Sequence, residues 1–149
     1  MKVAIRISSN TLSDDIKRAL KAAQNPQPAL EAAAAVIVEH AKRAFIEPGL
    51  RPVTWPALAA STIRAKQRAH KSLGMLIREG HLIRTPRIIQ SSRRRVLVGS
   101  NLFYARFHQL GTKRIPARPF WPFDAQGRVR PRTLAICSAV MRRRLGIAK

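Results

Sequence analysis

Residue types that commonly carry out acid–base or metal chemistry are few in this sequence. The four histidines are His40, His70, His81 and His108, and most of the seven acidic residues fall within the first 47 positions. No two histidines have the i, i+4 spacing with acidic companions that marks a zinc site on a helix. We therefore expect no metal site and no catalytic pair of carboxylates.

One segment nevertheless allows two chemical interpretations. Gly111-Thr112-Lys113 has the residue order found at the end of a phosphate-binding loop, but the earlier glycine of such a loop is missing at the required spacing. His108 is a candidate general base, although the sequence assigns no carboxylate beside it to orient the ring. Both chemical interpretations are weak, and we expect a protein that is not an enzyme and has no cofactor or small-molecule substrate.

The same segment predicts a short amphipathic helix. Phe103, Phe107 and Leu110 recur at i, i+4 and i+7, which is the spacing of one helical face. Gly111 supplies the left-handed conformation with which many helices end. The sequence therefore predicts a helix over residues 103–110 that stops at Gly111.

A proline-rich segment follows and carries two large aromatic side chains. Pro116 and Pro119 each fix φ and favour extended geometry at the residue before them. The stretch 115–122 is therefore expected to be stiff and extended, with Phe120 and Trp121 as anchors. These rings either pack into the core of this chain or reach a neighbouring subunit, because aromatic side chains bury large areas.

Three stretches of the sequence together resemble one protein family. They are Trp55-Pro56-Ala57-Leu58 with Thr62, then Leu76 to Leu82 with Gly80, and then Tyr104 to Phe120. In this order and spacing they resemble the phage virion morphogenesis family, the tail completion proteins of Mu-like phages and prophages. One departure is Glu79, where the family usually has Thr. The motif residues that serve as interface or core anchors are Trp55, Leu58, Tyr104, His108, Gly111, Pro116, Arg118, Pro119, Phe120 and Trp121.

The resemblance implies a structural protein of virion assembly. It implies action in tail completion, at the end of the tail that joins the head, with localisation in the virion and in the bacterial host cytoplasm during assembly. Such a protein would bind like copies, in a homo-oligomer or ring, and other tail or neck proteins. The resemblance also gives His108 a packing role rather than a catalytic one.

The chain is strongly basic. Its 29 Lys and Arg against 7 acidic residues give a formal charge of +22, which attracts polyanions. Each basic cluster is either an ordinary solvated surface or a contact to DNA or to an acidic partner, and cations at the end of the last helix also complement the helix dipole. A basic nucleic-acid-binding protein without a virion role is the alternative function. The clusters are Arg93-Arg94-Arg95, Lys113-Arg114 and Arg142-Arg143-Arg144.

Length and composition predict one soluble α+β domain over residues 1–149, with several helices packed on a small, mainly antiparallel sheet. The lone Cys137 excludes an intramolecular disulfide and is expected to be buried beside Leu134, Met141 and Leu145. No apolar run reaches the length of a membrane span, and Arg6 interrupts the only short apolar run near the N-terminus.

Local patterns predict the order of the elements. Ser13 is the expected N-cap of the first helix, with Asp14 and Asp15 in its first turn. Pro86 is expected to make the first strand of the hairpin an edge or bulged strand. The resemblance to the family implies a short helix within 76–82. The elements predicted from local patterns are a strand over 2–8, helices over 13–23, 28–46 and 56–69, strands over 83–90 and 94–99 joined at 91–93, a helix over 103–110, a turn over 124–127 and a helix over 131–145.

Overall fold

The structure is a computed structural model that describes residues 9–123 and 127–147. It has the α+β class predicted from the sequence. The predicted strand over 2–8 and most of the predicted turn over 124–127 fall outside the described residues. In chain order the elements are α1 (Ser9–Gln24), α2 (Gln27–Arg43), the 3-10 helix η1 (Pro48–Leu50), α3 (Ala60–Arg68), α4 (His81–Arg84), β1 (Arg87–Ser92), β2 (Arg95–Gly99), α5 (Ala105–Leu110) and α6 (Pro131–Leu145).

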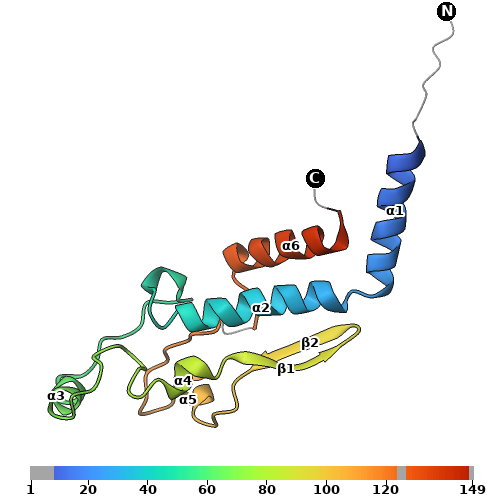
Figure 1. The fold of residues 1–149 in the computed structure, drawn as a ribbon. Coiled ribbons are helices and arrows are strands. Elements are labelled where there is room, and N and C mark those ends of the chain that lie inside the picture. The colour runs from blue at the N-terminus through green and yellow to red at the C-terminus, as the bar shows by residue number, and fades with distance from the viewer. Residues whose placement is uncertain (1–8, 124–126, 148–149) are drawn as a thin grey trace, which may run out of the picture.

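Helix α2 is the central element, with α6 along one side of it and the β1–β2 hairpin along the other (Figure 1). Its alanine-rich sequence makes this possible, because small side chains let neighbouring elements approach closely. Ala33 and Ala41 are buried in α2, and the Sγ atom of Cys137 on α6 lies 3.6 Å from the Ala33 carbonyl oxygen. The α2–α6 pair is further joined by a hydrogen bond of 3.1 Å between the Thr133 hydroxyl and His40 Nδ1.

Strands β1 and β2 form a two-stranded antiparallel sheet. The register pairs Arg87 with Gly99 and Ser92 with Arg95, and it shifts between Ile88 and Gln90. The irregular strand that the sequence predicts is therefore present, although Pro86 lies just before β1 rather than inside it. The turn comprises residues 93–94 and not 91–93 as predicted.

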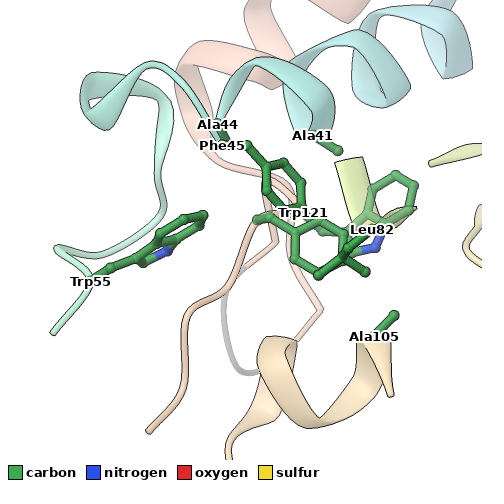
Figure 2. Close-up of a cluster of buried hydrophobic side chains, with 8 residues drawn as sticks. Ala41, Ala44, Phe45, Trp55, Leu82, Ala105 and Trp121 are labelled. Atoms are coloured by element: carbon green, nitrogen blue, oxygen red, sulfur yellow. The ribbon is translucent and has the colours of Figure 1, made fainter. Parts of the chain in front are cut away.

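A cluster of aromatic rings forms the main core at the C-terminal end of α2 (Figure 2). Phe45 lies 6.0 Å from Trp55 in an edge-to-face arrangement and 5.0 Å from Phe120, measured between ring centroids. Trp121 is next to Phe120 at 5.8 Å. Leu82 and the small residues of α2 and α5 close this core. The proline-stiffened segment thus places both of its predicted anchors in the core of its own chain.

Helix α6 has the bounds that the sequence predicts, because Pro131 provides a local start signal. The face that it buries differs in part from the prediction. Thr133 and Cys137 point inward, whereas Leu134 is half exposed. Burial of Cys137 confirms the prediction for the lone cysteine, and this burial raises the pKa of its thiol.

Several predictions of element bounds are wrong. Helix α2 ends at Arg43 and not at residue 46, and residues 83–84, predicted to begin a strand, lie in α4, so that β1 begins at Arg87. Helix α1 begins at Ser9, so Ser13 lies inside it and the first turn contains no acidic residue. Helix α3 begins at Ala60 and not at Pro56, because residues 54–59 are extended or irregular. Residues 76–80 form no helix: Gly80 has a φ of 78° and precedes α4 instead of ending a helix.

Within the described ranges, no helix is both long enough and apolar enough to cross a bilayer.

Candidate functional site

A single pocket of about 470 Å³ is lined by residues from all three motif stretches. Leu58 and Thr62 come from the first stretch, residues 76–82 from the second, and Tyr104 and His108 from the third. These stretches are far apart in the chain, so the fold brings them together at one place on the surface. Arg118 lines the same pocket and links its walls.

Arg118 connects the proline-rich segment to the loop before α3. Its side chain is 9% exposed, and its Nε and Nη2 atoms donate hydrogen bonds to the Pro56 carbonyl oxygen at 3.1 and 2.9 Å. Nη2 also donates to the Ala57 carbonyl oxygen at 3.1 Å. The Arg118 backbone N–H donates to the carbonyl oxygen of His108 at 2.7 Å. One residue therefore fixes both α5 and the loop against the extended segment.

Trp55 makes a second connection between the same two parts of the chain. Its Nε1–H donates to the Pro119 carbonyl oxygen at 2.8 Å. The guanidinium carbon of Arg51 lies 4.0 Å from the centroid of the Trp55 ring, which is the geometry of a cation–π contact. The ring is buried, so Trp55 attaches the loop to the core as a packed anchor.

Gln109 is a structural member of the site that the sequence did not single out. Its Oε1 atom accepts hydrogen bonds from the backbone N–H groups of Phe120 and Trp121, at 3.0 and 3.1 Å. Buried backbone N–H groups need such an acceptor. The available signal was the position of Gln109 inside the third motif, next to His108.

Gly111 ends α5 as predicted and turns the chain back onto it. Its φ of 76° and ψ of 175° are accessible to glycine, and a Cβ atom here would lie 2.9 Å from the backbone nitrogen of Ala117. The Thr112 hydroxyl accepts hydrogen bonds from the N–H groups of Arg114 and Ile115. Gly111-Thr112-Lys113 therefore forms a tight turn after α5.

His108 lies half buried at the pocket wall. Its ring meets that of Tyr104 edge to face at 6.0 Å, and its Nδ1 atom is buried with no hydrogen-bond partner in the described residues. Burial, and then the positive charge of Arg118, lower the pKa of His108. No carboxylate of the described residues hydrogen-bonds to the ring. The imidazole thus packs against the Tyr104 ring at the pocket wall, and the packing role that the resemblance implies for His108 stays a prediction.

The lowered pKa of His108 predicts a loss of stability in mild acid. The folded state binds a proton at His108 less readily than the unfolded state does. The contribution of neutral His108 to the free energy of unfolding is therefore complete above the unfolded pKa of about 6.5. It is lost as the pH falls below that value toward the lower pKa of the folded protein. Urea unfolding should give a lower free energy of unfolding at pH 5.5 than at pH 7.5. In the His108→Gln variant the difference between the two pH values should be smaller. An unchanged difference between the two pH values in the variant would contradict the assignment.

The basic clusters are distributed between two ends of the domain. Residues 93–95 form the hairpin turn and the strand start after it, and residues 142–144 form the last turn of α6. Both lie at the end where α1 meets α2 (Figure 1). Residues 113–114 follow α5, near the opposite end of the hairpin. Two of the three predicted clusters thus lie toward the same end of the domain, on opposite sides of α2, and the third follows α5.

Within residues 9–123 and 127–147, no group of three or more His, Cys, Asp or Glu side chains is arranged to hold a metal ion.

Comparison with known proteins gives one result that agrees with the motifs. The sequence model of the phage virion morphogenesis family matches residues 7–148 of the 149. Searches of curated proteins and of solved structures gave no match. The family match extends well beyond the three motif stretches, which lie between Trp55 and Phe120. The chain therefore belongs to the phage virion morphogenesis family, and its role lies in virion assembly.

Proposed function

We propose that the protein acts in tail completion and head–tail joining, through self-association and contacts with other virion proteins, and that it has no enzymatic activity. The observation that carries this proposal is the convergence of the three motif stretches on one surface pocket. At the pocket, Arg118 donates hydrogen bonds to the backbone carbonyls of Pro56 and Ala57, and the motif residues Trp55, Phe120 and Trp121 belong to the adjoining core. They build a rigid surface, and that is what a protein acting by contact requires.

The outer face of α5 supports the proposal of self-association. Phe103 is 75% exposed and Leu110 is 74% exposed, although both belong to the predicted apolar face. Phe103 packs only edge to face against the rings of Tyr104 and Phe107. Large exposed apolar side chains next to one another are typical of protein–protein interfaces. We place the contact between copies, or between this protein and a tail or neck protein, at this face, next to the motif pocket.

A double substitution at this face tests the proposal. Phe103→Ser with Leu110→Ser should weaken self-association at least about tenfold, because central apolar residues of an interface each contribute on the order of 2 kcal/mol. Ile46→Ser with Leu73→Ser is the matched control, since both residues are also exposed but lie elsewhere. Mass in solution measured by sedimentation, and electron microscopy of tails made with each variant, provide the readouts.

Two results are expected together. The α5 variant should sediment as a smaller species and yield tails that do not join heads, whereas the control should resemble the wild type. Normal assembly and normal head joining with the α5 variant would refute this assignment.

A further inference from the structure

We infer that the end of the domain where α1, α2, the hairpin turn and the last turn of α6 meet binds duplex DNA through its phosphate backbone. This surface, here called the basic end, includes Lys21 of α1 with the clusters 93–95 and 142–144. The biological meaning of this inference rests on the proposed virion role. Duplex binding itself does not, because it can be measured with the purified protein.

Hydrogen bonds fix the hairpin turn at this end. Arg93 Nε and Nη2 donate to the carbonyl oxygen of Gln24, the last residue of α1, at 2.9 and 2.6 Å. The Ser91 hydroxyl and the Gln27 side chain, at the start of α2, are joined at 3.1 Å. Helix α6 packs on α2 and also contacts α1, which brings its C-terminal turn to the same end (Figure 1). Clusters that are almost 50 residues apart in sequence therefore lie at the same end of the domain, on opposite sides of α2.

The charges of this surface are largely uncompensated. Arg94, Arg95 and residues 142–144 are exposed, and in the described part of the chain no carboxylate lies within ion-pair distance of them. Two acids lie on elements of this end: Glu31 on α2, whose pKa is lowered by hydrogen bonds from Ser91 and then Gln27, and Asp14 on α1, which pairs with Lys17 at 3.9 Å. The helix dipole accounts for cations at the end of α6. It does not account for Arg94 and Arg95, which lie in a hairpin.

The spacing of the two clusters fits a duplex. Helix α2 lies between α6 and the hairpin, and packed layers of this kind are each about 10 Å apart, so the clusters are separated by about 20 Å. This is roughly half a helical turn of DNA, along which phosphates repeat every 3.4 Å or so on each strand. Both clusters can therefore contact one duplex at the same time.

The chemistry of the surface favours phosphate over an acidic protein. A guanidinium group pairs with phosphate oxygens through two parallel hydrogen bonds. The depression beside the end of α6 is lined by Val140, Arg143 and Arg144, so it offers two guanidinium groups to a phosphate. No groove-reading helix or arm is present at this end in the described residues, so the binding should be independent of sequence.

Fluorescence anisotropy with a labelled duplex of about two helical turns tests the inference over a series of salt concentrations. The test variant is R94Q/R95Q/R143Q/R144Q, which leaves the structural hydrogen bonds of Arg93 intact. The matched control is R64Q/R68Q/K113Q/R114Q, which removes the same number of positive charges from exposed positions away from the basic end. Circular dichroism establishes that both variants are folded.

The test variant should lose at least about tenfold in affinity at low salt, and its slope of log K against log salt should fall by about 3 to 4, since each neutralised phosphate contributes about 0.9. The control should keep most of the wild-type slope, and R94K/R95K/R143K/R144K should restore binding. Equal losses in the test variant and the control would overturn the inference, because they would show binding by net charge alone. Competition by polyglutamate as effective as that by unlabelled duplex would also overturn it, in favour of an acidic protein.

The result is separable from the proposed function. The Phe103→Ser/Leu110→Ser variant keeps the basic end, so it should bind duplex DNA like the wild-type protein even if it fails to assemble. Failure of the basic-end variant alone would leave the role of α5 intact.

Discussion

Replacing Phe120 by alanine should destabilise the domain by about 3–5 kcal/mol, the usual cost of deleting a buried aromatic ring. Phe120 is 0% exposed and contacts the rings of Phe45 and Trp121 at centroid distances of 5.0 and 5.8 Å. Prolines on both sides hold the backbone of this segment, so the core cannot readily collapse into the vacated space. The cavity should therefore remain and add its cost to the lost burial of the ring.

Urea unfolding followed by circular dichroism measures this loss. Ile46→Ala is the control, because it removes a large apolar side chain from a position that is 70% exposed and lies away from the α5 face, and it should change stability by no more than about 0.5 kcal/mol. The midpoint of thermal unfolding should fall by roughly 10 °C for Phe120→Ala, at 2–4 °C for each kcal/mol in a chain of this size. Equal stability of the two variants would show that Phe120 is not a core anchor.

The second large effect is expected at Arg118. Arg118→Met removes three hydrogen bonds to the carbonyl oxygens of Pro56 and Ala57 while keeping much of the side-chain volume. Hydrogen bonds to charged groups contribute about 1.5–3 kcal/mol, so we expect a loss of about 2–3 kcal/mol. Arg118→Lys should recover less than half of it, because one ammonium group does not reproduce the planar fork.

A spectroscopic readout separates this role from simple packing. The charge of Arg118 is the second cause of the lowered pKa of His108, after burial. Arg118→Met should therefore raise the pKa of His108 part of the way to its ordinary value, whereas Arg118→Lys should keep it low. NMR titration of the imidazole resonances measures both. A pKa of His108 that does not move in Arg118→Met would contradict the proposed geometry of the pocket wall.

The long helices were predictable because their signals are local. Pro131 at the start of α6 and Pro28 in the first turn of α2 mark the helix beginnings, and the apolar spacing after each one identifies a helix. The consecutive aliphatic residues Val96, Leu97 and Val98 similarly identified β2. The fold class followed from these elements, without knowledge of how they pack.

The region between α3 and β1 was not predictable in the same way. Lys66 donates hydrogen bonds to the carbonyl oxygens of Ser72, Gly74 and Ile77, at 2.8, 2.7 and 2.8 Å, and so organises the following loop from outside it. Leu76 has a φ of 59°, which is unfavourable for a branched side chain and is imposed by this surrounding structure. Local sequence patterns contain no trace of such contacts, and the resemblance to the family implied a helix within 76–82 that residues 76–80 do not form.

The site was predictable as a set of residues but not as an arrangement. The motif positions identified Arg118, His108 and Trp55, yet nothing in the spacing showed that Arg118 would donate to Pro56 or that Gln109 would accept from two backbone N–H groups. Likewise, the apolar face of 103–110 was recognised, but its spacing does not say whether it points inward. Such facts depend on pairs of residues that are many positions apart in the chain.

The lone cysteine gives this domain a built-in reporter of partial opening. Cys137 is buried where α6 meets α2, away from the aromatic cluster. A thiol reagent can reach its sulfur only when α6 separates from α2, so the labelling rate measures how often the two helices part. If that rate exceeds the rate of global unfolding, α6 opens as a separate unit, and the arginines at its end can change position while the rest of the domain stays folded.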